Sequence, residues 1–406
     1  MASNNLDNRL RQDRRIFTRE KGSTSRHRPP SRYQKMADAT GGELLSNESG
    51  SFCLIRTEYR TGCRFGSCAI PSGLSDMEIP RFAFTAEHKE GSVRLTDLLF
   101  FDIETTGLGG TGAVAFLVGF GSVTTHGFEV RQYLLPDYCD ERAMLVHLMS
   151  ELTAGKTLVS YNGTAFDVNL LRDRMIVNRV AREIETEAHF DLLHVTRRLF
   201  RRRLKDCSLV NVERELLGFL RKDDIPGYLV PSVYFEWLAE ESLELLSSVL
   251  LHNRLDVVSL CFLLNHVASA FATEGGSLHE VDDIYSLSRV YGRRKMNEKV
   301  IRLLGGLQNG TGQPVKPEIL LYQAQALKRA GEWLSAVSLW EWLCGEQTKE
   351  GYWANVELAK YFEHKARDPL RAYEHTHRAG RVCPDGESHR RDLQKRLSRL
   401  RSKLNR

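Results

Sequence analysis

The spacing of apolar residues changes near the middle of the chain and divides it into two predicted architectures. Between residues 95 and 161, short apolar runs alternate with polar or glycine-rich segments. Apolar runs of about four to eight residues bounded by turn residues are typical of buried strands. The pattern predicts strands at 98–103, 113–123, 128–135 and 157–161, and a helix at 141–152. This order of elements favours an α/β layer in which helices flank a mixed central sheet.

After about residue 205 the strand pattern fades and helical spacing replaces it. One long helix is predicted at 243–271, and shorter helices follow at 283–293, 295–305, 317–330, 332–344, 351–364, 368–380 and 387–403. Small residues such as Ala324 and Ala330, and large ones such as Trp333 and Trp340, favour tightly packed helical hairpins. The arrangement resembles tetratricopeptide-type repeats of about two or three units. We therefore expect an all-α helical-repeat domain at 281–404.

The first 50 residues have a different composition. They hold ten Arg or Lys and six Asp or Glu, with many Ser, Asn and Gly residues and few large apolar ones. Such a segment buries too little apolar surface to offset the entropy lost on ordering. We expect residues 1–50 to be a disordered basic segment and residues 51–93 to be a lead-in of undetermined structure. The folded α/β domain is expected at 94–273.

The overall composition is that of a soluble globular protein, with 42% hydrophobic and 27% charged residues. No apolar run approaches the roughly 18 residues of a membrane span, and the polar start lacks the pattern of a secretory signal. These features predict a cytoplasmic protein without a membrane partner. The eight cysteines are too sparse for a disulfide scaffold. Cys53, Cys63 and Cys68 cluster without paired spacing, which favours reduced thiols over a zinc site.

Asp102 and Glu104 lie in the segment FDIETTG, at residues 101–107, where the first predicted strand ends. Residues i and i+2 of a strand point to the same face, so the two carboxylates project together. Their mutual repulsion is offset when a divalent cation binds between them. Oxygen-rich sites of this kind suit Mg²⁺ or Mn²⁺. For this pair alone, the alternative is that Glu104 ends the strand in solvent.

Two later segments add further candidates. The segment VSYNGTAFD, at 159–167, predicts a strand, a turn and then Asp167 at a helix start, where Asp is also a common N-cap. The segment LHNRLDVV, at 251–258, lies in the long helix and places His252 and Asp256 four residues apart on one helical face. Such a pair alone is commonly a surface hydrogen bond, so its meaning depends on the other motifs.

The three motifs in this order, DxE, N-x-x-x-F-D and H-x-x-x-D, are similar to the motif set of the DEDD superfamily of ribonuclease H-like 3′–5′ exonucleases. Over residues 95–270 the chain also resembles the YprB-type branch of bacterial ribonuclease H-like proteins. This resemblance lies in DIETTGL at 102–108, GGTG at 109–112, AFLVG at 115–119, HFDLLH at 189–194, CSL at 207–209, IPGY at 225–228 and HNRLD at 252–256. That branch also carries tetratricopeptide-like C-terminal helices, as the pattern at 283–403 does.

The resemblance implies an α/β ribonuclease H-like fold and a metal-dependent 3′–5′ exonuclease. Asp102, Glu104, Asp167 and Asp256 would hold two Mg²⁺ or Mn²⁺ ions roughly 3.5–4 Å apart, one activating the attacking water and one stabilising the leaving 3′ oxygen. His252 would accept the proton of that water. DEDD enzymes carry either Tyr four residues before the last Asp or His five before it. Here His252 stands four before Asp256, so its placement stays open.

The expected partner is DNA or RNA with single-stranded 3′ ends, and the helical domain is a candidate surface for a protein partner. Thr105 and Asn162 neighbour the carboxylates and are candidate nucleotide contacts, although Asn162 is equally suited to a turn. Arg197, Arg201 and Arg202 belong to the densest basic stretch, RRLFRRRLK at 197–205. Arginines of this kind position a strand through its phosphates, and a solvated helix face is the alternative. The net charge of +5 is compatible with such a partner.

Two functions from different classes remain at this point. The first is the exonuclease. The second is a catalytically weak or inactive nucleic-acid-binding or adaptor protein that acts through its helical repeats. The presence of all four carboxylates and a candidate base favours the enzyme. No motif separates DNA from RNA, because that choice depends on contacts to the 2′-hydroxyl.

Overall fold

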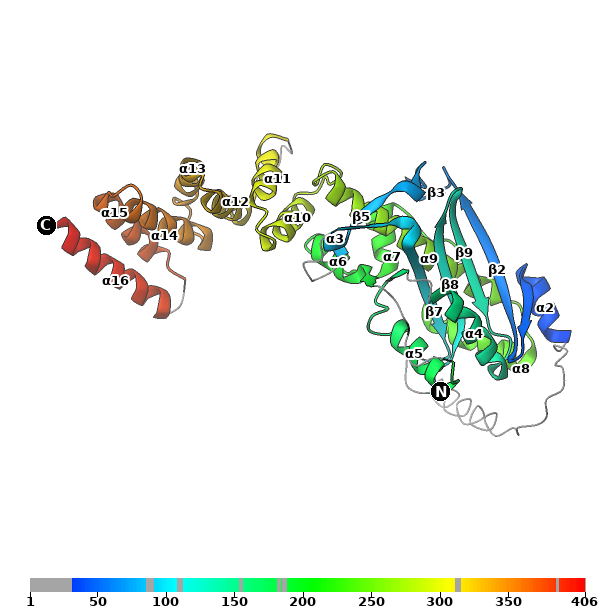
Figure 1. Cartoon of the computed structure of the whole chain (residues 1–406). Helices are drawn as coiled ribbons and strands as arrows, with labels where there is room; N and C mark the ends of the chain where they lie inside the picture. The colour runs from blue at the N-terminus through cyan, green and yellow to red at the C-terminus, as the bar shows by residue number, and fades with distance from the viewer. Residues whose placement is uncertain are drawn as a thin grey trace.

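The computed structural model describes residues 31–84, 91–107, 112–152, 156–180, 184, 188–310, 315–384 and 387–405, with 308–310 as backbone alone. Residues 1–30, most of the segment expected to be disordered, lie outside these ranges, as do Leu108 to Thr111 of the glycine-rich turn. Figure 1 shows an α/β unit followed by a row of helices that leads away from the sheet and ends with the C-terminus.

Seven strands form one mixed sheet in the described part of the chain. In spatial order they are β1 (Glu43–Asn47), β2 (Gly50–Arg60), β9 (Gly127–Leu134), β8 (Ala115–Thr124), β7 (Leu98–Thr105), β10 (Thr157–Ser160) and β11 (His189–Asp191). Neighbours from β1 to β7 pair antiparallel, whereas β10 pairs parallel with both β7 and β11. The predicted mixed sheet is confirmed. The carboxyl ends of β7, β10 and β11 meet at one edge, where the candidate residues gather.

Helices and short elements complete the α/β unit. The helices are α2 (Ser31–Thr40), α3 (Arg81–Phe84), α4 (Glu141–Leu152), α5 (Asp167–Val177), α6 (Leu192–Phe200), α7 (Leu209–Val212), α8 (Val230–Glu240) and α9 (Leu246–Ala272). The short strands are β3 (Arg64–Phe65), β4 (Cys68–Ala69), β5 (Glu78–Pro80) and β6 (Ser92–Arg94). Single turns of helix lie at Leu74–Asp76, Leu95–Asp97, Tyr138–Asp140, Glu213–Leu217 and Gly227–Leu229.

Strand β7 separates two apolar cores, and its alternation decides which way the acidic residues face. Phe100 packs in the core that contains Val257 and most of α9, whereas Phe101 packs in the opposite core with α4 and α8. Asp102 and Glu104 continue the series of Phe100, so they point toward α9. The period of two therefore aims both carboxylates at the helix that carries the other predicted acidic residue.

Helix α9 runs across β7, β8 and β9 as the central helix of the α/β unit. By length and composition it is a helix that could cross a membrane, but 67% of its most apolar window is buried inside the fold. Its mean hydropathy is explained by this position between the sheet and the neighbouring helices.

The prediction that residues 1–50 are disordered is wrong for 31–50. Helix α2 buries Tyr33, Met36 and Ala37, and β1 forms a hairpin with β2 at the edge of the sheet. The hydroxyl of Tyr33 donates to Asp140 at 2.6 Å. A few well-spaced apolar residues docking on a sheet edge are enough to order the segment, which average composition does not reveal. The lead-in expected at 51–93 likewise begins with β2, an integral strand of the sheet.

The C-terminal half is helical throughout its described residues. It consists of α10 (Val281–Arg293), α11 (Asn297–Gly310), α12 (Pro317–Ala330), α13 (Trp333–Leu343), α14 (Lys349–His364), α15 (Pro369–Arg381) and α16 (Glu387–Leu404). Each helix packs against the next, which fits the tetratricopeptide-like expectation. The core of the α/β unit continues into α10, α11 and part of α12, whereas other residues of α12 pack with α13 to α16 in separate cores.

Candidate active site

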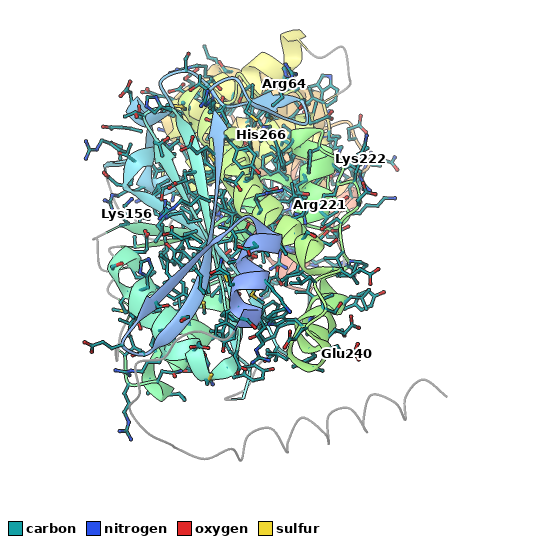
Figure 2. All side chains as sticks on the ribbon, turned by 90° about the vertical axis from the view of Figure 1, so that its right-hand side faces the viewer. Arg64, Lys156, Arg221, Lys222, Glu240 and His266 are labelled. Carbon is teal, nitrogen blue, oxygen red and sulfur yellow. The ribbon has the colours of Figure 1, made fainter. Side chains whose placement is uncertain are left out.

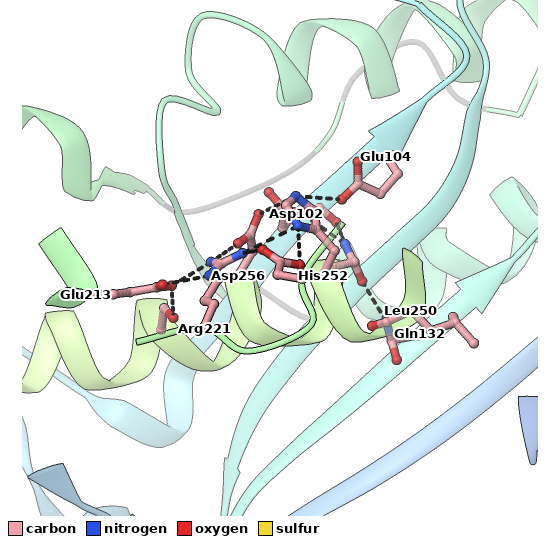
Figure 3. Close-up of polar contacts among 11 residues, drawn as sticks. Asp102, Glu104, Gln132, Glu213, Arg221, Leu250, His252 and Asp256 are labelled. Atoms are coloured by element: carbon pink, nitrogen blue, oxygen red, sulfur yellow. Dashed lines mark hydrogen bonds and ion pairs between the residues drawn. The ribbon is translucent and has the colours of Figure 1, made fainter. Parts of the chain in front are cut away.

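The predicted site residues arise from three elements that meet at one edge of the sheet. β7 supplies Asp102 and Glu104, α5 begins with Asp167, and α9 carries His252 and Asp256. The His252 Nε2 atom lies 4.0 Å from a Glu104 carboxylate oxygen and 3.8 Å from an Asp256 carboxylate oxygen (Figure 3). One ligand atom from each of these three residues lies within 4.8 Å of the other two.

The carboxylates influence one another strongly because they lie together in a site that solvent reaches only in part. Burial raises the pKa of Asp102 well above its usual range, and Asp256, Glu104 and Asp167 raise it further. Burial and the charge of Asp256 raise the pKa of Glu104 to about 7. Burial, Asp191 and Asp256 raise the pKa of Asp167 to about 7. These mutual effects indicate that four acidic side chains from separate segments share one electrostatic site.

His252 is oriented by an acidic residue that sequence analysis did not identify. Its Nδ1 atom lies 2.8 Å from a carboxylate oxygen of Asp224. A carboxylate accepts hydrogen bonds, so Nδ1 carries the proton and Nε2 faces Glu104 and Asp256. Burial lowers the pKa of His252, but the charges of Asp256 and Glu104 outweigh burial and raise it overall.

Arg221 is a second residue that the sequence did not single out. Its side chain is 4% exposed and donates to Asp256, to Glu213 at 2.6 Å and to Asp224 at 3.0 Å. Figure 2 shows Arg221 inside the outline of the molecule and its neighbour Lys222 toward the rim. The run RKDD at 221–224 was the available signal, but a short run of charged residues in a loop usually indicates solvent exposure. Arg221 therefore holds Asp256 and Asp224 in place through its ion pairs with both carboxylates.

Asn253 connects α9 to the strand that carries Asp102. Its side-chain amide donates to Asp102 Oδ2 at 3.0 Å and to the Asp102 backbone carbonyl at 3.2 Å. Gln132 on β9 donates to Asn253 Oδ1 at 2.9 Å and so fixes the orientation of the amide. A Cβ atom on Gly119 would lie 2.3 Å from Asn253 Oδ1, which explains glycine on β8 at this place.

The turn before Asp167 is held by Asp191. The Asp191 carboxylate accepts from the backbone N–H groups of Asn162 at 2.8 Å, Thr164 at 3.2 Å and Leu193 at 3.1 Å. Asp191 is thus the N-cap of α6. Asn162 has a φ of 67°, a left-handed conformation that asparagine tolerates, so its turn role is supported by geometry.

Gly163 follows in this turn and is required by close packing. A Cβ atom on it would lie 2.4 Å from Ser160 Oγ and 3.1 Å from Asp167 Oδ2. The turn therefore brings its backbone against the end of β10 and directs Asp167 toward the other carboxylates.

The remaining candidates for substrate contact are Thr105 and the three arginines on or just after α6. Thr105 donates through its hydroxyl to the Gly107 carbonyl at 2.7 Å, which stabilises the segment after β7. Arg197 and Arg201 are exposed on α6 and just after it. Arg202 is different, because it pairs with Asp282 and Glu318 of the helical domain. Its guanidinium is already engaged within the protein.

The donor set fits a divalent cation that prefers oxygen ligands. Glu104, His252 and Asp256 offer two carboxylates and an imidazole close enough to bind one ion. Asp102 and Asp167 add carboxylates whose raised pKa values reflect the same uncompensated negative field. A cation placed there would remove the repulsion that now favours protonation of these groups.

Comparison with known proteins agrees with this geometry. The model of the RNase_H superfamily matches residues 99–268. The chain is 37% identical over 276 residues to "Uncharacterized protein YprB" of Bacillus subtilis (strain 168), covering 67% of this chain and 66% of that protein. The chain thus spans slightly less than two thirds of this relative's length.

Comparison with solved structures gives a weaker likeness. The family B DNA polymerase of the archaeon Pyrobaculum calidifontis aligns with a TM-score of 0.35 and 16% identity, covering 60% of this chain and 34% of the polymerase. A likeness of this size adds nothing to the assignment, which depends on the family model and the YprB relative. Residues 99–268 therefore match the ribonuclease H superfamily, and the chain is similar to YprB over 276 residues.

Proposed function

We propose that this protein is a metal-dependent 3′–5′ exonuclease that hydrolyses phosphodiester bonds of DNA or RNA. The observation that carries the proposal is the meeting of Asp102, Glu104, Asp167 and Asp256, from three elements, in one partly buried electrostatic site. Burying four carboxylates is costly unless cations compensate them. A site in which four carboxylates nevertheless lie together is suited to holding Mg²⁺ or Mn²⁺ against a phosphate.

The carboxylates form the binding part of the site. Bound divalent cations would supply an activated water and stabilise the charge that develops on the leaving oxygen. Asn253 keeps Asp102 turned toward α9 through its two hydrogen bonds. Arg221 keeps Asp256 in place through a guanidinium that solvent hardly reaches. Both residues act through the acidic side chains they hold.

His252 is the proposed proton acceptor. Its Nδ1 is fixed by Asp224, so Nε2 is the nitrogen presented to the space beside Glu104 and Asp256. An imidazole held in one tautomer by a carboxylate is better oriented to accept a proton than a free one. The spacing of four residues from Asp256 suits this geometry, because i and i+4 share one face of α9.

The first test is degradation of single-stranded DNA and RNA labelled at the 5′ or the 3′ end, with Mg²⁺, Mn²⁺ or EDTA. We expect metal-dependent shortening from the 3′ end in single-nucleotide steps and no cleavage of a circular strand. The substitution Asp167→Asn should abolish activity. Asp173→Asn is the matched control, because Asp173 is exposed on the same helix.

Three outcomes would count against the proposal. Cleavage of the circle would indicate an endonuclease. Shortening from the 5′ end would reverse the direction. Activity unchanged by EDTA and by Asp167→Asn would remove the acidic site from the mechanism. Binding of nucleic acid by folded protein without any cleavage would favour an adaptor that acts through the helical domain.

A further inference from the structure

Helix α6 connects the candidate active site to the helical domain. It begins at Asp191, whose carboxylate also holds the turn that leads to Asp167. Its nine residues extend about 13 Å, given a rise of about 1.5 Å per residue. The helix packs against α10, the first helix of the helical domain (Figure 1). Any feature along α6 therefore lies on a path from the acidic site to that domain.

Two pairs of arginines line a pocket between these helices. Arg197 and Arg201 are four residues apart on α6 and its C-terminal end, and Arg289 and Arg293 are four apart on α10. Each pair shares a helical face, and all four residues are exposed. The pocket has a volume of about 430 Å³ and is also lined by His194, Arg198, Arg202, Ser286 and Val290.

Asp282 and Asp283, at the start of α10, form ion pairs with residues other than the four exposed arginines. Asp282 accepts from Lys316 at 2.9 Å and from Arg202 at 3.3 Å, and Asp283 accepts from Arg203 at 2.8 Å. These ion pairs fix α10 against the end of α6. Within the described ranges, no carboxylate lies within ion-pair distance of Arg197, Arg201, Arg289 or Arg293. These four exposed arginines are therefore a concentration of positive charge without an ion-pair partner among the described residues, whereas Arg202 of the same pocket is already paired with Asp282 and Glu318.

Repulsion among these arginines destabilises the folded protein. Like charges four residues apart destabilise a helix. Burial lowers the pKa of Arg198, and repulsion by Arg294 and Arg293 lowers it further. Arginines near helix C-termini gain roughly 0.3–1 kcal/mol from the helix dipole, which suits Arg201 and Arg293 singly. The helix dipole does not explain why two pairs of arginines face the same pocket. Binding of an external polyanion in the pocket would explain it.

The pocket is connected to the acidic site through α6, which begins at Asp191 and carries Arg197 and Arg198 of the pocket lining. Arg197 acts electrostatically on Tyr161, the residue before the turn at 162–164, and Arg197 and Arg201 both act on Cys207. Basic charge thus starts beside the turn that directs Asp167 and continues along α6 to α10. A negatively charged chain that entered the acidic site would follow this line of arginines.

We propose that this pocket binds the phosphate backbone of the substrate several nucleotides away from the bond that is cut, so that α10 of the helical domain forms part of the substrate site. The inference rests on the proposed function for the identity of the polyanion. Arginine forks match phosphate oxygens in pairs of hydrogen bonds. Apart from the imidazole of His194, the lining residues present no aromatic ring on which a base could stack, so the pocket would mainly contact the backbone without selecting sequence.

The test compares binding of short and long oligonucleotides. Fluorescent oligo(dT) and oligo(rU) of 4 and 20 nucleotides are titrated in EDTA, where cleavage cannot occur, at several salt concentrations. The variant is Arg289→Gln with Arg293→Gln. The matched control is Arg60→Gln with Arg64→Gln, which removes two exposed positive charges from β2 and β3. Melting temperatures confirm that both variants are folded.

We expect the α10 variant to lose at least tenfold in affinity for the 20-mer and almost nothing for the 4-mer. For this variant, the slope of log affinity against log salt concentration should be smaller in magnitude by about 1.4. This is the change expected when two phosphate contacts to a single strand are lost. The control variant should behave as wild type. An equal loss for both lengths, an equal loss in the control variant, or unchanged affinity for the 20-mer would overturn the proposal.

The same proteins separate this inference from the proposed function. If length-dependent loss occurs but wild type never cleaves with Mg²⁺ or Mn²⁺, the pocket binds nucleic acid and the exonuclease proposal fails. If wild type degrades long strands from the 3′ end and the α10 variant does so equally well, the exonuclease stands and the pocket is not part of it. Binding of inorganic phosphate without binding of either oligonucleotide would also overturn the inference.

Discussion

Asp224 and His252 are 28 residues apart in sequence, yet the Asp224 carboxylate lies 2.8 Å from Nδ1 of the imidazole. Asp224 follows Arg221 in a loop that folds over α9, and Arg221 also contacts it at 3.0 Å. The loop therefore supplies the acidic partner that fixes the ring, while α9 supplies the ring itself. His252 owes its orientation to this loop.

Asp224→Asn should reduce kcat while leaving KM almost unchanged, because Asp224 acts by positioning His252. Loss of such a supporting carboxylate typically lowers activity about 10–100-fold. Steady-state rates measured across pH should also show a changed dependence in the limb set by His252, which a purely structural defect would not cause. Asp223→Asn, at the exposed neighbouring position, is the control. Equal pH profiles for wild type and Asp224→Asn would contradict the role.

Arg221→Met should destabilise the protein by about 3–5 kcal/mol. The substitution leaves Glu213, whose side chain is 0% exposed, and Asp256 without their shared cation. Chemical denaturation measures the loss, and Lys222→Met at the exposed neighbouring position should have little effect. Adding Glu213→Gln to Arg221→Met should recover part of the stability. No recovery would mean that the unpaired carboxylate is not the cause.

Gly119→Ala should reduce both stability and activity. The new methyl group would meet the Asn253 amide and displace the group that holds Asp102. Overpacking of this kind costs about 1–3 kcal/mol. Gly380→Ala is the control, because a Cβ on Gly380 meets no atom within 4 Å. If Gly119→Ala melts and cleaves like wild type, the contact between β8 and Asn253 does not position Asp102.

Mn²⁺ should raise the melting temperature of the wild-type protein, and Asp102→Asn should weaken that rise. An ion that binds the folded state alone stabilises it by about 2.7 kcal/mol at a hundred times its Kd. Differential scanning calorimetry with and without EDTA measures the effect independently of activity. Asp76→Asn, a substitution at an acidic residue outside the candidate site, should keep the full shift. A wild-type melting temperature that does not change when Mn²⁺ is added would argue against a metal at this site.

The helical domain should lose stability as pH falls from about 6.5 to about 4. His375 is buried with Nδ1 3.0 Å from Asn355 Oδ1. Burial, Arg378 and Arg371 lower its pKa to about 4. The unfolded chain, with a histidine pKa near 6.5, binds the proton first, so this contribution is complete above pH 6.5 and declines below it.

Thermal unfolding of wild type and His375→Gln across this range tests the prediction. The wild-type melting temperature should fall more steeply than that of the variant, because glutamine does not titrate. Parallel curves for the two proteins would show that His375 does not set the acid sensitivity.

The sequence by itself determined many of the elements after residue 95 and the direction of the key side chains. The predicted strands and helices from 98–103 to 387–403 lie where the structure has them, and the long helix predicted at 243–271 is Leu246–Ala272. Asp102 and Glu104 share a face because strands have a period of two, and His252 and Asp256 share one because helices have a period near 3.6. Each of these relations joins residues that are close in the chain, so it can be predicted from the sequence alone.

Only the tertiary structure decided which residues support the site and which arginines stay unpaired. Asp224 and Arg221 reach α9 through a loop whose path depends on packing, and Arg202 meets Asp282 and Glu318 across the junction with the helical domain. Helix α2 is ordered by docking on the sheet edge, which composition alone did not predict. These contacts join segments far apart in the chain, and local periodicity carries no information about such pairs.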